Sequence, residues 1–187
     1  MTSSVVTRRG VLGGLAGLGA IAAAPSFAGT PAVLTGAGDI RSVKIFNPRT
    51  GERVDSVYWV EGEYIPQVLD EINYLFRDWR RNEIRAVDVR TIDIMAAASR
   101  LMDTTETYQL MSGYRSPETN RALSRSHRGV ARNSYHTRAM AADLRLSSRS
   151  VQNMYEAGVA CGAGGVGRYP RSNFVHFDCG PVRTWNG

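Results

Sequence analysis

The sequence predicts an α+β domain in which helices pack on a small antiparallel sheet. Two long segments, residues 65–82 and 91–102, carry apolar residues at the three- and four-residue spacing of a helix. Short segments rich in strand-forming residues follow at 108–112, 141–146 and 174–179. Because helices and strands are segregated rather than strictly alternating, the α+β class is favoured. The 187 residues, 43% hydrophobic and 21% charged, suit one globular domain.

The first expected element is a β-hairpin. Residues 43–46 and 55–60 are rich in β-branched and aromatic side chains. Between them, residues 47–51 read Asn-Pro-Arg-Thr-Gly, which is typical of a turn. These three segments together predict two antiparallel strands.

The helices have recognisable ends. Pro66 suits the first turn of the helix expected over residues 65–82. Ser116-Pro117 predicts the start of another helix, because proline is favoured in the first turn. A further helix is expected over residues 150–161, with Gly162 ending it. The segments 108–112, 141–146 and 174–179 supply the remaining strands.

The first 28 residues predict an export signal. Arg8-Arg9 precede a glycine- and alanine-rich apolar run, and Ser26-Phe27-Ala28 suits a signal peptidase. The paired arginines indicate the twin-arginine route to the periplasm. An uncleaved anchor is the alternative, but the run is short for the roughly 20 residues of a spanning helix. We expect a flexible leader over residues 29–40 and the folded domain over 41–187.

Charge and hydropathy exclude some partners. The formal charge of +6 falls to +4 once the signal is removed, because that segment holds two arginines and no acidic residue. Such a mild charge does not predict nucleic-acid binding, which usually requires a denser basic face. No segment after the signal is apolar enough to span a membrane. The oligomeric state is left open.

The chain has three histidines, and two of them have acidic neighbours in the sequence. His136 lies seven residues before Asp143, which falls in a predicted strand. Imidazole and carboxylate are both zinc ligands, so the pair could belong to a metal site. The alternative is that Asp143 pairs with an arginine and His136 is a surface residue. His127, in a basic polar stretch, is expected to be solvated.

His176 and Asp178 are expected on one face of the last predicted strand, because alternate residues of a strand share a face. Burying both groups is costly unless each has a partner. A metal would satisfy both side chains. A core histidine hydrogen-bonded to Asp178 would do so as well.

Four motifs together resemble the M15-type zinc peptidases of bacterial cell walls. They are SGYRSPETN at residues 112–120, SYHTRAMAAD at 134–143, FVHFD at 174–178 and VRTW at 182–185. Their order and spacing are most similar to the exported murein endopeptidase branch. The resemblance covers residues 41–185, nearly all of the expected mature chain.

The resemblance implies a catalytic site. His136, Asp143 and His176 match the residues that hold one Zn²⁺ per chain, in a cleft at the sheet. Arg115 matches an arginine near the substrate carboxylate or the tetrahedral intermediate, and Ser134 would bind substrate or orient the groups around His136. The implied function is hydrolysis of peptide cross-links in peptidoglycan, with D,D- and L,D-bonds both open. Alternatives are a carboxypeptidase or dipeptidase trimming stem peptides, and a non-catalytic wall-binding domain.

The chain departs from the family pattern at two places. The family usually has glycine where this chain has Ala139, which is tolerable unless the backbone there has a positive φ. Many relatives place Glu or His two or three residues before the last zinc histidine, where this chain has Asn173 and Phe174. Asp178 is therefore our candidate general base, and its alternative role is to support His176.

Two other features suggest different chemistry. Residues 162–167 match G-x-G-x-x-G, but a helix precedes them, so we expect a flexible loop rather than a nucleotide site. Cys161 and Cys179 are expected to form a disulfide or to remain as two buried thiols. A redox function based on these cysteines is a weaker alternative.

Overall fold

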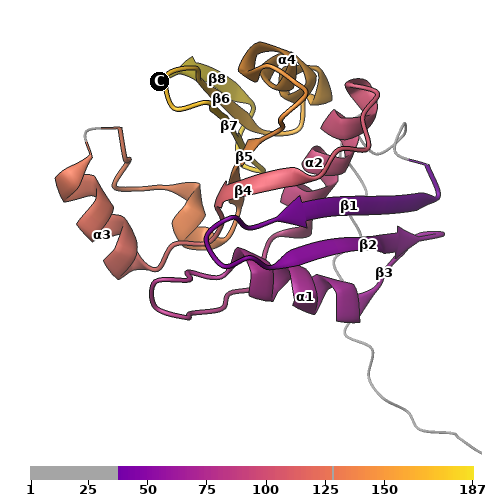
Figure 1. Ribbon diagram of the computed structural model, residues 1–187, viewed down its shortest axis with the longest axis horizontal. Helices are drawn as coiled ribbons and strands as arrows, with labels where there is room; N and C mark the ends of the chain where they lie inside the picture. Colours follow the sequence, from indigo (N-terminus) through magenta and orange to yellow (C-terminus); the bar gives the residue numbers. More distant parts are fainter. Residues whose placement is uncertain (1–37, 128) are drawn as a thin grey trace, which may run out of the picture.

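The computed structural model describes residues 38–127 and 129–187. The predicted export signal and residues 29–37 of the predicted leader lie outside this part. The described chain forms an eight-stranded sheet with the order β3-β2-β1-β4-β5-β7-β6-β8 (Figure 1). Most neighbouring strands are antiparallel, and the two parallel pairs are β1 with β4 and β6 with β8. The predicted α+β class is confirmed.

The elements follow one another in a mixed order. The strands are β1 (Ile40–Phe46), β2 (Arg53–Val60), β3 (Glu63–Tyr64), β4 (Tyr108–Ser112), β5 (Ala141–Arg145), β6 (Gly165–Tyr169), β7 (Phe174–Asp178) and β8 (Arg183–Asn186). The helices are α1 (Pro66–Phe76), α2 (Val89–Leu101), α3 (Pro117–Ser126) and α4 (Val151–Cys161), with a 3₁₀ turn, η1, at Tyr135–Arg138.

The predicted hairpin, helix starts and central strands are confirmed. Asp88 caps α2 by accepting a hydrogen bond from the Arg90 amide. Ser116 caps α3 in the same way, accepting from the Thr119 amide. Ser150 caps α4, and Gly162 ends it in the left-handed conformation with φ +62°.

The prediction of a helix through residue 82 was wrong, because α1 ends at Phe76. Arg77 donates hydrogen bonds to both carboxylate oxygens of Glu52, at 2.7 and 2.9 Å. The next residue, Asp78, accepts from the amide and hydroxyl of Ser116. These tertiary contacts hold the chain after α1 in a turn, although its sequence continues the apolar periodicity.

Two strands near the end of the chain were not predicted. Residues 165–167, expected within a loop, belong to β6, which pairs with β7. The terminal segment forms β8 beside β6. Gly165 and Gly167 give little strand signal by themselves, but they allow close approach: a Cβ at Gly167 would overlap the Trp185 ring.

The hydrophobic core lies between the sheet and three helices. Helix α2 packs against α4, β1 and β7, while α1 packs against β2 and α4 against β6 and β7. Helix α3 stands apart from this layer, at the left of Figure 1. The strands β5 and β7, which carry the predicted ligands Asp143 and His176, lie in the middle of the sheet.

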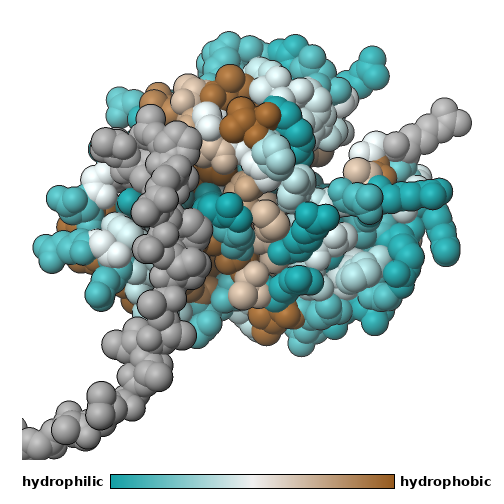
Figure 2. Space-filling view, turned by 180° about the vertical axis from the view of Figure 1, so that it is seen from behind, coloured by the Kyte–Doolittle hydropathy of each residue, from teal (hydrophilic) through white to brown (hydrophobic). Residues whose placement is uncertain are grey.

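Among the residues that the structure describes, no helix is long and apolar enough to cross a membrane. On the face seen in Figure 2, outside the area covered by grey atoms, hydrophobic patches are interrupted by hydrophilic residues. Cys161 and Cys179 are free and buried, so the alternative of two buried thiols is confirmed over a disulfide.

Candidate metal centre

Three predicted ligands converge at one point. His136 comes from η1, Asp143 from β5 and His176 from β7, and the last two are directly opposite residues of an antiparallel pair. Asp143 Oδ1 lies 3.1 Å from His136 Nε2 and 2.9 Å from His176 Nδ1. The two ring nitrogens are 3.2 Å apart. All three side chains are buried, and they form a group that could hold a metal ion.

The local backbone aims His136 at the sheet. Ser134 caps η1 through its hydroxyl, which accepts a hydrogen bond from the His136 amide at 3.4 Å. The turn ends at Ala139, which has φ +55° and ψ +37°. The position where the resembled family has glycine therefore does require the left-handed conformation, which costs a residue with a Cβ about 1–2 kcal/mol.

Each histidine is held from its outer side by an acceptor. His136 Nδ1 lies 2.7 Å from the Gly113 carbonyl oxygen, which can only accept a hydrogen bond. His176 Nε2 lies 2.9 Å from Asp178 Oδ2. Both outer nitrogens therefore carry protons. In the neutral rings, this leaves lone pairs on His136 Nε2 and His176 Nδ1, which face Asp143.

This arrangement fits a divalent metal. Two imidazole nitrogens and a carboxylate oxygen lie within about 3 Å of one another, where their lone pairs repel unless a proton or a metal cation lies among them. Atoms bound at about 2.0–2.2 Å to one tetrahedral zinc lie roughly 3.3–3.5 Å apart, close to the distances here. Two nitrogens and one oxygen favour zinc over magnesium or calcium. A three-residue site also leaves a position open for a further ligand.

The pKa values of His136 and Asp143 agree with this assignment. Burial lowers the pKa of His136, so its imidazole is neutral near pH 7. Burial raises the pKa of Asp143, but the adjacent His136 and His176 outweigh that effect and hold the pKa well below its ordinary value. For His176, burial lowers the pKa, but hydrogen bonds to Asp143 and Asp178 raise it above its ordinary value, so a metal bound at Nδ1 would displace a proton. The side chain of Asp143 is therefore ionised at neutral pH.

Asp178 is enclosed by donors. Its side chain is completely buried, and it accepts from His176 and from both Nη atoms of Arg183. Its Oδ1 also accepts from the amides of Gly165 at 3.3 Å and Gly180 at 2.9 Å. These contacts favour the role of supporting His176 over that of a base, because a base needs an oxygen that can reach water.

Arg115 and Ser134 both line the cleft beside the three ligands. Arg115 Nη2 donates to Asp143 Oδ2 at 2.9 Å, and its Nε donates to Ser112 Oγ at 2.9 Å. This pairing leaves Asp143 Oδ1 facing the histidines. Arg115 Nη1 makes no hydrogen bond to the described residues, so it is free to bind a substrate oxygen.

The cleft has a volume of about 580 Å³. The segment from Gly129 to Tyr135 supplies several of its lining residues, and Tyr169, Phe174 and Trp185 supply aromatic surface. Asp143 carries the only carboxylate side chain among the described residues that line it. The three predicted ligands therefore border a cleft with aromatic and polar walls.

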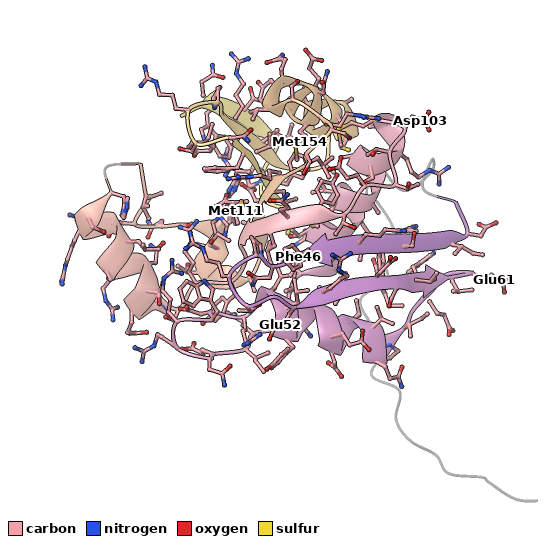
Figure 3. The ribbon with its side chains drawn as sticks, in the orientation of Figure 1. Phe46, Glu52, Glu61, Asp103, Met111 and Met154 are labelled. Carbon is pink, nitrogen blue, oxygen red and sulfur yellow. The ribbon has the colours of Figure 1, made fainter. Side chains whose placement is uncertain are left out.

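Sequence reasoning missed two groups at this centre, the Gly113 carbonyl and the Arg183 guanidinium. Gly113 follows β4, two residues after Met111, which is labelled in Figure 3. Nothing in a sequence marks which carbonyl will accept from a histidine. Arg183 belongs to the VRTW motif. That motif contributed to the resemblance to the family, but it did not indicate what the arginine does.

The remaining candidates lie apart from the ligands or are unreactive. His127 is exposed at the end of α3 and does not line the cleft. Burial raises the pKa of both Cys161 and Cys179 to about 11, so both thiols stay protonated at neutral pH. This protonation disfavours the redox alternative, which needs a thiolate.

Comparisons with known proteins agree with these motifs. Residues 35–185 match the family model described as peptidoglycan L,D-endopeptidase MepK. A protein of that name from Escherichia coli K12 is 40% identical over 176 residues, which cover 93% of each chain. A probable peptidoglycan L,D-endopeptidase MepK from Haemophilus influenzae is 36% identical over 142 residues, covering 75% of this chain and 76% of that protein. No solved structure matches the chain.

Proposed function

This chain belongs to the M15-type peptidase family described as peptidoglycan L,D-endopeptidase MepK, and on that premise we propose how it cleaves peptidoglycan. It is a peptidoglycan endopeptidase, which hydrolyses peptide cross-links. We propose that the bonds are L,D-linked, as in the names of its relatives, and that one zinc ion is held by His136 Nε2, Asp143 Oδ1 and His176 Nδ1.

The convergence of three lone-pair atoms on one point carries this proposal. Their outer partners, the Gly113 carbonyl and Asp178, already fix both ring orientations, so the donor set is organised in advance. The chemistry that zinc supplies in such a site is Lewis acidity, which polarises an amide carbonyl and acidifies water.

The chain's own residues would position the substrate. Arg115 has a free Nη1 beside Asp143, where it can bind the carbonyl oxygen as negative charge develops, or a carboxylate next to the scissile bond. Ser134 lines the same cleft and keeps η1 in place. No carboxylate side chain other than Asp143 lines the described cleft, so the proposal includes no carboxylate base. Asp178 is assigned to hold His176.

The site of action follows from the substrate. Peptidoglycan lies outside the cytoplasmic membrane, so a chain that cleaves it works in the cell envelope. We propose export to the periplasm by the twin-arginine route, on the basis of Arg8-Arg9 and the apolar run that follows them. Replacing Arg8-Arg9 by Lys-Lys is expected to keep the protein in the cytoplasm, as cell fractionation would reveal.

The function is tested by digesting defined muropeptide dimers with the purified, zinc-loaded protein. Mass spectrometry should detect conversion of L,D-linked dimers to monomers and little conversion of D,D-linked dimers. His136→Ala should abolish conversion, whereas the control His127→Ala, outside the cleft, should retain it. Release of free amino acids or dipeptides from monomers would instead indicate stem trimming. Intact dimers of both types, from folded and zinc-loaded protein, would contradict the proposal.

A further inference from the structure

We propose that Arg183 is a positioning residue for the metal centre, acting through Asp178 on His176. This inference rests on the proposed metal site. Arg183 Nη1 donates to Asp178 Oδ1 at 2.9 Å, and Nη2 donates to Oδ2 at 2.7 Å. The same Oδ2 accepts from His176 Nε2 at 2.9 Å. A two-point contact of this kind fixes the plane of the carboxylate as well as its position.

The residues around the Asp178 carboxylate accommodate its ion pair with Arg183. The Gly165 and Gly180 amides donate to Asp178 Oδ1, so two amides, the guanidinium and the imidazole hold one buried anion. A Cβ at Gly165 would lie 2.5 Å from Asp178 Oδ2 and would overlap Arg183 Nη1. The absence of a side chain at Gly165 therefore leaves room for the ion pair between buried Asp178 and exposed Arg183.

The guanidinium is itself held by two aromatic rings. Its carbon lies 5.0 Å from the centre of the Tyr135 ring and 4.8 Å from that of Trp185. Tyr135 directly precedes His136 on η1, and the Trp185 ring lies 5.2 Å from the His176 ring. Arg183 thus connects β8 with the segments that carry both histidine ligands.

Electrostatics and positioning predict opposite effects of removing Arg183. A guanidinium near a cation site repels the metal, so its removal should tighten metal binding if charge alone mattered. In our proposal the removal frees the Asp178 carboxylate to turn, and His176 loses the partner that aims Nδ1 at the metal. Loss of such a supporting contact typically weakens metal affinity by about 10–100-fold.

The test compares Arg183→Gln and Arg183→Lys with wild type and with Arg168→Gln. Arg168 lies on the adjacent strand β6 and donates to Asn186, outside the contacts of Asp178. Zinc dissociation constants are measured by competition with a chromophoric chelator, and visible absorption spectra report ligand geometry in the cobalt-substituted proteins. Thermal unfolding of the metal-free proteins checks that each variant is folded.

Arg183→Gln is expected to weaken zinc binding by at least tenfold and to alter the cobalt spectrum. Arg183→Lys keeps the charge but loses the two-point contact, so it should weaken binding by a smaller factor, while Arg168→Gln should match wild type. Unchanged or tighter zinc binding with an unchanged cobalt spectrum, in either folded Arg183 variant, would overturn the inference. A wild-type protein that binds zinc but cleaves no muropeptide would refute the proposed function and leave this inference standing.

Discussion

The role of His176 depends on the contacts that each of its two ring nitrogens makes. Its Nδ1 faces Asp143 and His136, while its Nε2 faces Asp178. The sequence motifs were sufficient to propose the three ligands, because their order and spacing resemble a known family. They could not give the ligand atom of His136, since that depends on the Gly113 carbonyl, which the fold brings from another segment.

The two roles considered for Asp178 predict different kinetics for Asp178→Asn. A supporting residue acts through metal binding, so zinc affinity should fall about tenfold or more, while kcat at saturating zinc falls by no more than about tenfold. Removing a general base typically lowers the rate by about 10²–10⁴-fold whatever the zinc concentration. Muropeptide cleavage rates across a zinc titration separate the two cases. A loss of 100-fold or more at saturating zinc would assign Asp178 the catalytic role.

At the scale of elements, the chain leaving α1 packs against the chain leaving β4. The Tyr114 amide donates to the Phe76 carbonyl, and the neighbouring Gly113 carbonyl accepts from His136. A Cβ at Gly113 would lie 2.5 Å from the Phe76 carbonyl oxygen and 3.0 Å from its Cα. The end of α1 therefore helps to set the position of His136, one of the three proposed metal ligands.

We expect Gly113→Ala to destabilise the fold by about 1–3 kcal/mol, because the backbone of α1 must shift to admit the methyl group. Zinc affinity should fall as well, since the displaced carbonyl no longer aims His136. Urea unfolding of the metal-free protein measures the first effect, and chelator competition the second. Gly129→Ala is the control for stability, because a Cβ there meets nothing within 4 Å. Equal unfolding free energies for the two variants would contradict the account.

The contact between the β1–β2 turn and the end of α1 predicts a pH dependence. The Arg77 guanidinium holds the pKa of Glu52, labelled in Figure 3, below its ordinary value. A carboxylate with a lowered pKa stabilises the fold above its unfolded-state pKa, and that stabilisation is lost as pH falls through the folded pKa. Glu52→Gln should therefore cost about 1 kcal/mol at pH 7. The difference from wild type should begin to shrink as pH falls below about 4.3, the ordinary pKa of glutamate, and should disappear once pH is below the lowered pKa of Glu52 in the folded protein.

Urea unfolding of wild type and Glu52→Gln at pH 7, 5 and 3 measures how the stability difference between them changes with pH. A difference that is as large at pH 3 as at pH 7, or that grows on acidification, would show that Glu52 does not act through its charge. Arg77 is also where α1 stops short of its predicted end. The periodicity of residues 77–82 is helical, so only the tertiary partners Glu52 and Ser116 could have revealed the break.

For the whole molecule, the fold class and most helices and strands could be predicted from the sequence. The strands β6 and β8, which complete one side of the sheet, could not. The hairpin, α2, α4 and the central strands follow from local periodicity and capping residues, which the fold respects. Strands β6 and β8 do not, because Gly165, Gly167 and Arg183 have weak strand preferences and are ordered by their neighbours. These two strands supply much of what surrounds Asp178, so the part of the fold that was missed is also the part that supports the metal centre.

The central claim is that one metal ion held by His136, Asp143 and His176 makes this chain an endopeptidase. It is tested most directly by removing metal from the full chain with a chelator and following an L,D-linked muropeptide dimer by mass spectrometry as zinc is added back. We predict no cleavage by the metal-free protein, and full restoration at one equivalent of zinc for wild type but not for His136→Ala. Undiminished cleavage by the metal-free protein, or by His136→Ala, would contradict the account.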